Sequence, residues 1–365
     1  MRKVAGSLFF LASVLCVAQV PVPFVTDQDR FMVFANGRFE KLEPRPPQEV
    51  HAMEGQVVYR DHEGLLKVFL PEGRRLHLLD AKADGVVHAT RSRIAWNNAD
   101  TLKTVREGRN IVLMDGVERF AISDSVVVYI DSTLHQLSVL WKNHAIPLAD
   151  VAQGSERPQW MQGSNTVAFF NKGDRKLFAF YRGGVRTLCD STDVGIVATG
   201  GDVIGYWDGN SKRFMALYRG GEEFLSDLRP ASVQAGEGLL AYVDGNARLK
   251  CFWKGEVHTV LGSIPTGYWV KDSLLTYLDD GRFMLFRPGG SEVVEPYVPE
   301  QWKIEGNTLV YLDINRELRG IRNGERVRFG NEANISWFDL FGGNVVYRSP
   351  LGNTVVVTPR RSYIF

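Results

Sequence analysis

The sequence is poor in cysteine, nearly neutral in charge and without helical periodicity. Its 365 residues include three cysteines, and 43 basic residues balance 42 acidic ones, giving a formal net charge of +1. This balance excludes nucleic acid and anionic membranes as expected partners, because both select a basic surface. No window of about eleven residues holds apolar positions at helical spacing between turn signals. We therefore expect an all-β protein.

Motifs of familiar enzyme and metal sites are also missing. There is no Gly-x-Ser-x-Gly elbow and no His-Glu-x-x-His pair. The seven histidines do not cluster at metal-ligand spacings. We assign no catalytic residue, no metal ligand and no cofactor.

A single long apolar run stands at the N-terminus. Arg2 and Lys3 precede an apolar stretch over residues 4–17, and Cys16-Val17-Ala18 has the small-x-small pattern of a cleavage site. The stretch is too short and wrongly flanked for a membrane span. Removing its two basic residues from the 43 leaves 41 against 42 acidic residues, a net charge of −1.

We predict a signal peptide over residues 1–18 with cleavage after Ala18, and one domain over residues 19–365. The mature chain is then secreted or periplasmic and has no transmembrane span. Leu15 stands before Cys16 where a lipoprotein signal prefers a small residue, so a lipid anchor remains only an alternative.

The mature chain keeps two cysteines. Cys189 falls in an outer-strand position of the repeat described below, and Cys251 falls in a third-strand position two repeats later. Thiols so far apart are beyond the reach of a disulfide. We expect two buried free thiols that pack as small apolar groups.

What the chain does contain is a repeat. A short apolar run, an aromatic residue, one further residue and usually Asp or Asn recur at intervals of 33 to 40 residues, with a mean of 36. Such a period is typical of a repeat architecture. The aromatic positions are Tyr59, Trp96, Tyr129, Phe169, Tyr206, Tyr242, Tyr277, Tyr311 and Tyr347.

Turn residues define the unit between these aromatics. In residues 231–261, short apolar runs alternate with turns at residues 236–238, 244–246 and 254–255. Tight turns join antiparallel strands, so each unit is a four-stranded meander. Such sheets, repeated without helices, close radially into a β-propeller. A solenoid usually has parallel strands, and an outer-membrane barrel needs longer ones.

The two ends predict how the ring closes. Residues 29–54 align with residues 281–305 as a unit without its first two strands, and residues 337–365 supply a first, second and third strand. Pairing these ends in one composite blade would remove exposed sheet edges. Eight complete repeats lie between them. We predict an all-β fold, a single β-propeller of eight to nine four-stranded antiparallel blades closed by pairing of its N- and C-terminal strands.

One run also suggests a family. Residues 307–313, Asn-Thr-Leu-Val-Tyr-Leu-Asp, followed by a charged, apolar-alternating strand, resemble the WD40-like repeats of TolB-type propellers. The Pro-Asp-Gly turn of those repeats is absent, and Trp207-Asp208 alone matches their Trp-Asp pair. The resemblance implies a secreted or periplasmic platform for protein binding.

The Asp or Asn that follows the aromatic has two interpretations. One carboxylate per repeat cannot gather the six to eight oxygens that calcium needs. Asx residues that close hairpin turns explain the series instead. The series comprises Asp61, Asn98, Asp131, Asn171, Asp208, Asp244, Asp279 and Asp313.

Aromatic residues also mark the start of the predicted inner strands. We place them in one slot that Val233 and Ile196 occupy elsewhere. Large rings there either fill the gap between neighbouring blades or form a collar at the channel mouth that stacks on sugars or anchors a protein. Solvent exposure distinguishes the two. The aromatic residues are Phe120, Trp160, Trp269, Trp302 and Trp337.

The long loops between outer and next inner strands carry further candidates. Arg157 and Arg229 lie in two of them, and such loops commonly carry function on a rigid scaffold. Glu295 and Glu300 flank Tyr297, but a carboxylate pair beside aromatics is weak support for acid–base chemistry. We take the four tryptophans of the slot and these two arginines as candidate binding residues.

The first functional hypothesis is an exported, non-enzymatic propeller that binds a protein or glycan through its loop face or channel mouth. One alternative is a propeller hydrolase or lyase whose polar residues converge at the channel mouth. Another is a structural component of a cell-envelope complex, which would show a large exposed apolar patch.

Overall fold

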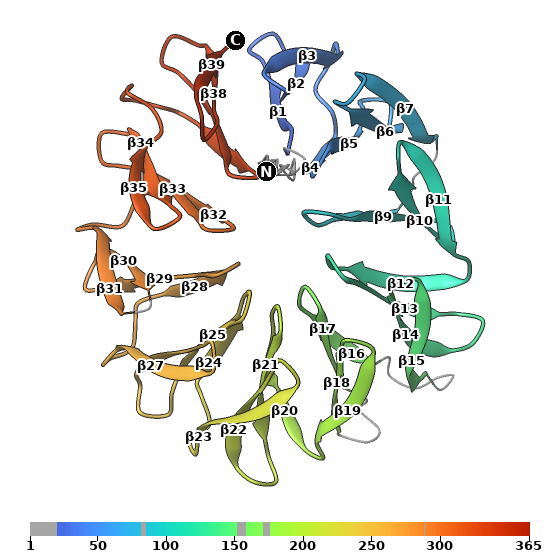
Figure 1. The fold of residues 1–365 in the computed structure, drawn as a ribbon, viewed down its shortest axis with the longest axis vertical. Helices are drawn as coiled ribbons and strands as arrows, with labels where there is room; N and C mark the ends of the chain where they lie inside the picture. Colours follow the sequence, from blue (N-terminus) through green and yellow to red (C-terminus); the bar gives the residue numbers. More distant parts are fainter. Residues whose placement is uncertain (1–19, 82–84, 152–157, 171–175, 288) are drawn as a thin grey trace, which may run out of the picture.

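The computed structural model describes residues 20–81, 85–151, 158–170, 176–287 and 289–365. Within them the chain forms ten antiparallel sheets, arranged radially around one axis (Figure 1). We call the sheets blades 1 to 10 in chain order. The predicted all-β propeller is confirmed, but the predicted count of eight to nine blades is wrong. The predicted signal peptide lies outside the described residues.

Each blade consists of strands that are consecutive in the sequence. Blade 1 contains β1 (Val22–Val25), β2 (Phe31–Ala35) and β3 (Arg38–Glu43). Blade 2 contains β4 (Glu49–Met53), β5 (Gln56–Arg60), β6 (Leu66–Leu70) and β7 (Arg75–Asp80). Blade 3 contains β8 (Val87–Ala89), β9 (Ile94–Asn98), β10 (Thr101–Arg106) and β11 (Arg109–Met114). Blade 4 contains β12 (Val117–Ile122), β13 (Val126–Asp131), β14 (Gln136–Trp141) and β15 (His144–Asp150). Blade 5 contains β16 (Gln159–Gln162), β17 (Thr166–Phe170), β18 (Leu177–Tyr181) and β19 (Gly184–Cys189). Blade 6 contains β20 (Thr192–Thr199), β21 (Val203–Asp208), β22 (Arg213–Tyr218) and β23 (Gly221–Ser226).

The remaining four blades repeat this order. Blades 7 and 8 contain β24 (Ser232–Ala235), β25 (Leu239–Val243), β26 (Leu249–Trp253), β27 (Glu256–Leu261); and β28 (Tyr268–Lys271), β29 (Leu274–Asp279), β30 (Arg282–Arg287), β31 (Gly290–Glu295). Blades 9 and 10 contain β32 (Trp302–Glu305), β33 (Thr308–Leu312), β34 (Leu318–Arg322), β35 (Glu325–Arg328); and β36 (Phe338–Phe341), β37 (Asn344–Arg348), β38 (Thr354–Val357), β39 (Ser362–Ile364).

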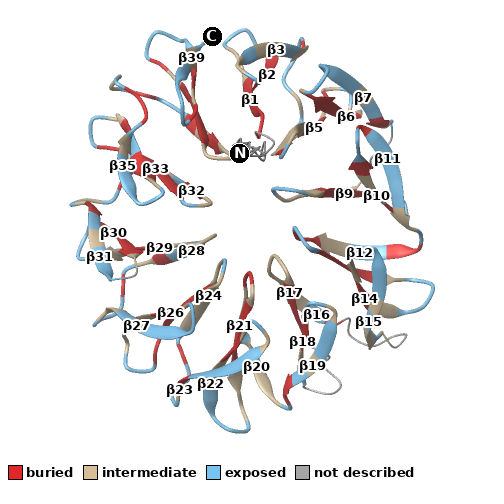
Figure 2. Cartoon of the chain, viewed as in Figure 1, coloured by how far each residue is buried: buried red, intermediate tan, exposed pale blue. Residues whose placement is uncertain are grey.

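In a four-stranded blade the first strand lies nearest the axis and the fourth lies at the rim. The two middle strands are mostly buried and the outer strand is largely exposed (Figure 2). The core therefore lies between the faces of neighbouring blades, in a series of apolar clusters rather than one centre. The recurring aromatics are part of these clusters, and Tyr59 and Tyr242 are fully buried.

The recurring Asp closes a hairpin turn, as the Asx interpretation predicts. One Asp61 carboxylate oxygen accepts the N–H groups of Glu63 and Leu65, both at 2.9 Å. Asp244 and Asp313 accept the equivalent pairs of N–H groups in blades 7 and 9. Satisfying two backbone donors at once fixes the turn. The member of the series at position 171 lies outside the described residues.

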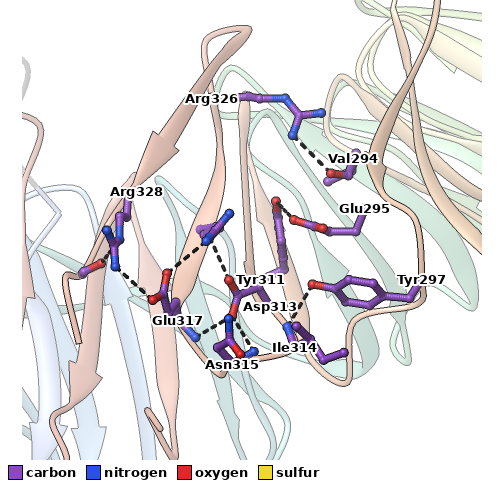
Figure 3. Close-up of polar contacts among 12 residues, drawn as sticks. Val294, Glu295, Tyr297, Tyr311, Asp313, Ile314, Asn315, Glu317, Arg326 and Arg328 are labelled. Carbon is purple, nitrogen blue, oxygen red and sulfur yellow. Dashed lines mark hydrogen bonds and ion pairs between the residues drawn. The ribbon is translucent and has the colours of Figure 1, made fainter. Parts of the chain in front are cut away.

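The aromatic also bonds to the preceding blade. In blade 9 the Tyr311 hydroxyl donates to Glu295 at the end of blade 8, over 2.7 Å (Figure 3). Trp96 Nε1 donates to Asp80 at 3.2 Å in the same way. The donor follows its acceptor by sixteen residues in both cases. This contact fixes the register of one blade against the next.

Ring closure differs from the prediction of a composite blade. Among the described residues, no N-terminal strand pairs with a C-terminal one. The ends hold two strands that the sequence pattern hides, β1 and β39, so that each end forms a separate sheet, of three described strands in blade 1 and four in blade 10. In blade 1, Phe24 faces the blade interface as the other aromatics do. Thr26 takes the place of the turn Asp, since its Oγ1 accepts the N–H groups of Gln28 and Arg30.

Side chains, not strand pairing, join blade 10 to blade 1. The Asn344 side-chain amide donates to the Val20 carbonyl at 3.2 Å, and Arg348 donates to the Val25 carbonyl at 2.7 Å and pairs with Asp27. Apolar side chains from β1, β2, β37 and β38 form one buried cluster between the two blades. The seam is thus held by an apolar cluster and by side-chain hydrogen bonds, without strand pairing among the described residues.

Both described cysteines are free and buried, as expected. Burial raises the pKa of the Cys189 thiol to about 11 and that of Cys251 to about 12. Thiols so rarely ionised are poor nucleophiles. In the part of the chain that the structure describes, no helix has the length and hydropathy to cross a membrane.

Candidate ligand-binding site on the inner strands

Strand register divides the four predicted tryptophans into two pairs. Trp160 and Trp302 lie opposite the recurring aromatic of the next strand, Phe169 and Tyr311. In blades 8 and 10 this position opposite the recurring aromatic, the slot, is held by Tyr268 and Phe338 instead. The assignment of all four tryptophans to one slot is therefore wrong. Trp269 lies one residue after the slot and Trp337 lies one residue before it.

A shift of one residue moves a side chain to the opposite face of a strand. The consequence is visible in exposure. Trp160 and Trp302 are half-buried and pack against apolar clusters between blades. Trp269 and Trp337 are 36% and 40% exposed. The first pair fits the structural interpretation of the slot, and the second pair has the exposure that the binding interpretation requires.

Trp269 is held in place by its neighbours. Its ring meets Trp302 of the next blade edge-on, with centroids 5.1 Å apart, and Trp302 in turn lies 5.2 Å from Phe283. A Cβ atom on Gly267 would come within 2.9 Å of the Trp269 ring. The absence of a side chain at residue 267 therefore allows the indole to lie against the backbone.

The two rings border a groove of about 570 Å³ along the inner strands of blades 7 to 10. We call it the axial groove. Its walls combine indole rings with polar and charged groups, a mixture typical of ligand sites. Its lining residues are Gln234, Trp269, Val270, Lys271, Trp302, Lys303, Ile304, Glu305, Asp339 and Leu340.

Charges in the axial groove are only partly compensated. Lys303 Nζ lies 2.6 Å from Asp339 Oδ1, which also accepts the Leu340 N–H at 2.7 Å. Glu305 accepts the backbone N–H of Gly343 at 3.4 Å. Lys271 makes no ion pair with any residue that the structure describes. Among the described residues, the groove therefore presents one cation and one carboxylate without an ion pair, Lys271 and Glu305, beside two aromatic rings.

A second hollow of about 560 Å³ lies where blade 1 meets blades 10 and 2. We call it the closure hollow. On β36 and just before it, Trp337, Asp339 and Phe341 alternate along one face and border this hollow. The others lining it are Pro23, Phe24, Val25, Phe31, Val50 and Arg348. Asp339 borders both the axial groove and the closure hollow.

The remaining predicted site residues lie elsewhere. Arg119 stacks on Trp160 at 4.4 Å, beside a crevice of only about 10 Å³. Arg229 pairs with Asp193 and borders neither the groove nor the hollow. Arg157 lies outside the described residues. Of the predicted residues that the structure describes, Trp269 and Trp302 meet at the axial groove, and Trp337 borders the closure hollow.

The carboxylates of the loop before Trp302 serve other contacts. Glu295 accepts the Tyr311 hydroxyl, and Glu300 pairs with Arg316 at 2.6 Å. Tyr297 accepts the Ile314 N–H at 2.9 Å (Figure 3). No group of three or more acidic, histidine or cysteine side chains within the described ranges could hold a metal ion.

Sequence reasoning missed Asp339, Phe341 and Arg348. The alternation of Trp337, Asp339 and Phe341 at every second residue was the available signal, because such residues share one face of a strand. They border a hollow beside blade 1, whose described residues form three strands, and the repeat pattern did not reveal this arrangement.

Comparison with known proteins identifies the family. A family model described as a 10-bladed beta propeller domain matches residues 15–361. The chain belongs to this family. The ten sheets of the structure agree with the blade number in that description.

Solved structures similar to this ten-bladed propeller share little sequence with it, and no curated protein matches. The computationally designed Ika8 protein is 13% identical, with a TM-score of 0.35, over 74% of this chain and 94% of that one. Apo AztD from Citrobacter koseri is 10% identical, with a TM-score of 0.38, over 85% and 93%. PorZ from Porphyromonas gingivalis, a surface component of the type-IX secretion system, is 10% identical, with a TM-score of 0.28, over 96% and 59%. Likeness at this level carries no functional argument.

Proposed function

We propose that this ten-bladed propeller is an exported, non-enzymatic protein that binds a protein or glycan partner on its inner strands. The observation that carries the proposal is the exposure of Trp269 and Trp337 beside two adjoining hollows. Large exposed aromatic rings in concave, partly apolar surroundings are typical anchors for partners. The predicted signal peptide supports export, and the resemblance to TolB-type propellers supports a binding role.

The experiment compares binding by the wild-type chain and a Trp269→Ala, Trp337→Ala double variant. Immobilised protein is exposed to a glycan array and to an envelope fraction of the native host. Trp253→Ala is the matched control, since this indole lies on β26 away from both hollows. We expect a ligand that the wild type and the control retain and the double variant loses. Equal retention by all three proteins would contradict the proposed site.

One observation favours a second candidate, a hydrolase or lyase. Glu305 and Asp339 both line the axial groove, and glycoside hydrolysis commonly uses two carboxylates. The ion pair of Asp339 with Lys303 argues for a binding role of this carboxylate instead. Release of product from a retained ligand, abolished by Glu305→Gln, would decide for the enzyme. Recovery of a stable multiprotein complex that survives the double variant would support the structural envelope role.

A further inference from the structure

The axial groove is lined by the first strands of four consecutive blades. These are β24, β28, β32 and β36, and every lining residue lies within the described part of the chain. The volume of about 570 Å³ falls within the range of small-molecule sites. The groove therefore suits a short ligand that lies between side chains.

Trp269 and Trp302 form a corner in this groove. Their ring planes are inclined at 69° with centroids 5.1 Å apart, so the rings meet edge to face. Trp302 packs into the apolar cluster between blades, which fixes one side of the corner. Trp269 is the more exposed ring. An indole already held by its neighbours loses little conformational freedom when a ligand lies on it.

The charged residues of the groove cancel. Lys303 pairs with Asp339, whereas Lys271 and Glu305 have no ionic partner among the described residues. Lys271 and Glu305 each lie three residues beyond the slot, on the neighbouring strands β28 and β32. Two lysines and two carboxylates give the lining a formal net charge of zero. Charge complementarity therefore favours a ligand without net charge.

The unpaired residues supply one donor and one acceptor. The Lys271 ammonium group donates hydrogen bonds only, and the Glu305 carboxylate accepts them only. Glu305 already accepts the Gly343 N–H at 3.4 Å, and a carboxylate has further lone pairs to offer. A hydroxyl both donates and accepts. Neighbouring hydroxyls on one ligand can therefore bond to both residues.

The edge of β28 offers few backbone groups to a peptide. The Gln234 side-chain amide donates to the Tyr268 carbonyl at 2.9 Å and accepts the Val270 N–H at 3.0 Å. The Asp272 carbonyl, next along this edge, accepts the Glu237 N–H at 2.6 Å. An extended peptide that adds to a sheet edge needs such groups for its own hydrogen bonds. A ligand here must therefore be held mainly by side chains.

We propose that the axial groove binds a short uncharged oligosaccharide, with one sugar ring stacked on Trp269 and hydroxyl groups bonded to Lys271 and Glu305. The inference rests on the proposed function and narrows its ligand class from protein or glycan to a neutral glycan. A pyranose ring combines an apolar face, which can lie on an indole, with hydroxyls around its rim. Those hydroxyls keep partners when the ring is buried, so the site avoids the cost of removing them from water.

The test exposes the immobilised full-length protein to an array of neutral, uronic-acid and sulfated oligosaccharides. We expect retention of neutral members and weaker retention of anionic ones. A retained oligosaccharide is then titrated in solution while tryptophan fluorescence is recorded, because stacking on Trp269 changes the emission of that indole. Retention of no neutral glycan, or retention of anionic glycans at least as strong, overturns the inference.

Variants connect the ligand to the groove. Trp269→Ala should weaken binding about tenfold or more, whereas Trp269→Phe keeps an aromatic face and should weaken it less. Lys271→Ala and Glu305→Ala should each weaken binding about fivefold or more, because each removes one partner of the sugar hydroxyls.

Three control variants lie outside the groove. Trp253→Ala removes an indole of β26, and Lys254→Ala removes a cation in the turn that follows it. Glu256→Ala removes a carboxylate whose side chain is 80% exposed. Each control should bind as the wild type does. A thermal unfolding curve for each variant confirms that it is folded before it is titrated.

Two results separate this inference from the proposed function. Glycan binding that Trp269→Ala, Lys271→Ala and Glu305→Ala leave unchanged overturns the placement of the sugar. If glycans fail but an envelope protein is retained in a manner that depends on Trp269, the proposed binding function holds and the glycan inference is wrong.

Discussion

The Tyr59 hydroxyl of blade 2 donates a 2.9 Å hydrogen bond to the Glu43 carboxylate at the end of blade 1. Lys67 Nζ lies 2.8 Å from the same oxygen and 2.7 Å from Asp61, so one lysine links the interblade contact to the hairpin turn. Tyr311 and Glu295 repeat the tyrosine contact between blades 8 and 9. At Tyr59, Trp96 and Tyr311 the aromatic thus has two functions: its ring fills the core and its polar atom bonds to the preceding blade.

Loss of this hydroxyl should weaken the ring. Tyr59→Phe leaves the ring in place but removes a donor to a nearly buried carboxylate, so we expect the free energy of unfolding to fall by about 1–2 kcal/mol. Tyr206→Phe is the control, because the buried Tyr206 hydroxyl meets no hydrogen-bond partner in the described structure. Urea denaturation of both variants measures the difference. Equal destabilisation would show that the Glu43 contact contributes nothing specific.

The turn aspartates should make stability depend on acid pH. Burial alone would raise the pKa of Asp244, but hydrogen bonds from Arg248, Lys250 and the Asn246 N–H outweigh it and lower the pKa below its usual value. A carboxyl whose pKa is lower in the folded chain stabilises the fold above its unfolded pKa, about 3.9, and loses that contribution as the pH falls through the folded pKa.

Asp244→Asn removes this contribution. We expect the variant to be less stable than the wild type at neutral pH, with a difference that shrinks as the pH drops below about 4. Unfolding free energies measured across this range test it. Asp227→Asn, which changes an exposed loop carboxylate 3.9 Å from Arg213, should follow the wild-type profile. A pH-independent difference for Asp244→Asn would contradict the role of its charge.

The two buried thiols should be inert in the folded chain. Because burial raises the pKa of Cys189 to about 11 and of Cys251 to about 12, neither is ionised appreciably near pH 8. We expect a thiol reagent to modify neither residue in native buffer and both in denaturant. Finding no free thiol in denaturant would reveal a disulfide instead.

The seam between blades 10 and 1 should respond to loss of Arg348. Replacing it with Met removes the bond to the Val25 carbonyl and the pairing with Asp27. We expect faster hydrogen exchange in β1 and β37, with the other blades little changed, because both of these interactions lie at this one interface. Arg282→Met, which breaks an ion pair inside one hairpin, should leave the seam unaffected. Uniform acceleration around the ring would contradict a local role.

The propeller fold was largely predictable because every blade needs hairpin turns and most carry a buried aromatic, so these residues recur at a regular interval in the sequence. The blade count was not, since Phe24 stands 35 residues before Tyr59 but lies among prolines and is followed by Thr26 in place of Asp. Proline argues against a strand unless that strand lies at a sheet edge, and the edge position of β1 in its described sheet is visible only in the structure.

The site was predictable only in part. Trp269 and Trp302 each lie at the start of an inner strand. The sequence does not show that Trp269 lies one residue beyond the position opposite the recurring aromatic, which Trp302 occupies. That displacement leaves Trp302 packed in the apolar cluster between blades and Trp269 more exposed, although both rings border the groove. Asp339 and Arg348 became candidates only through the hollow beside them.

The described strands of each blade come from one continuous stretch of chain, which has a consequence for assembly. A nascent chain can finish every sheet from residues already synthesised, and each new blade can pack on the one before it. Only the last interface joins distant segments, since Asn344 and Val20 are 324 residues apart in sequence. A contact of such separation carries the largest loop-closure cost. We therefore expect the interface between blades 10 and 1 to form last, as the step that turns an open arc of blades into a ring.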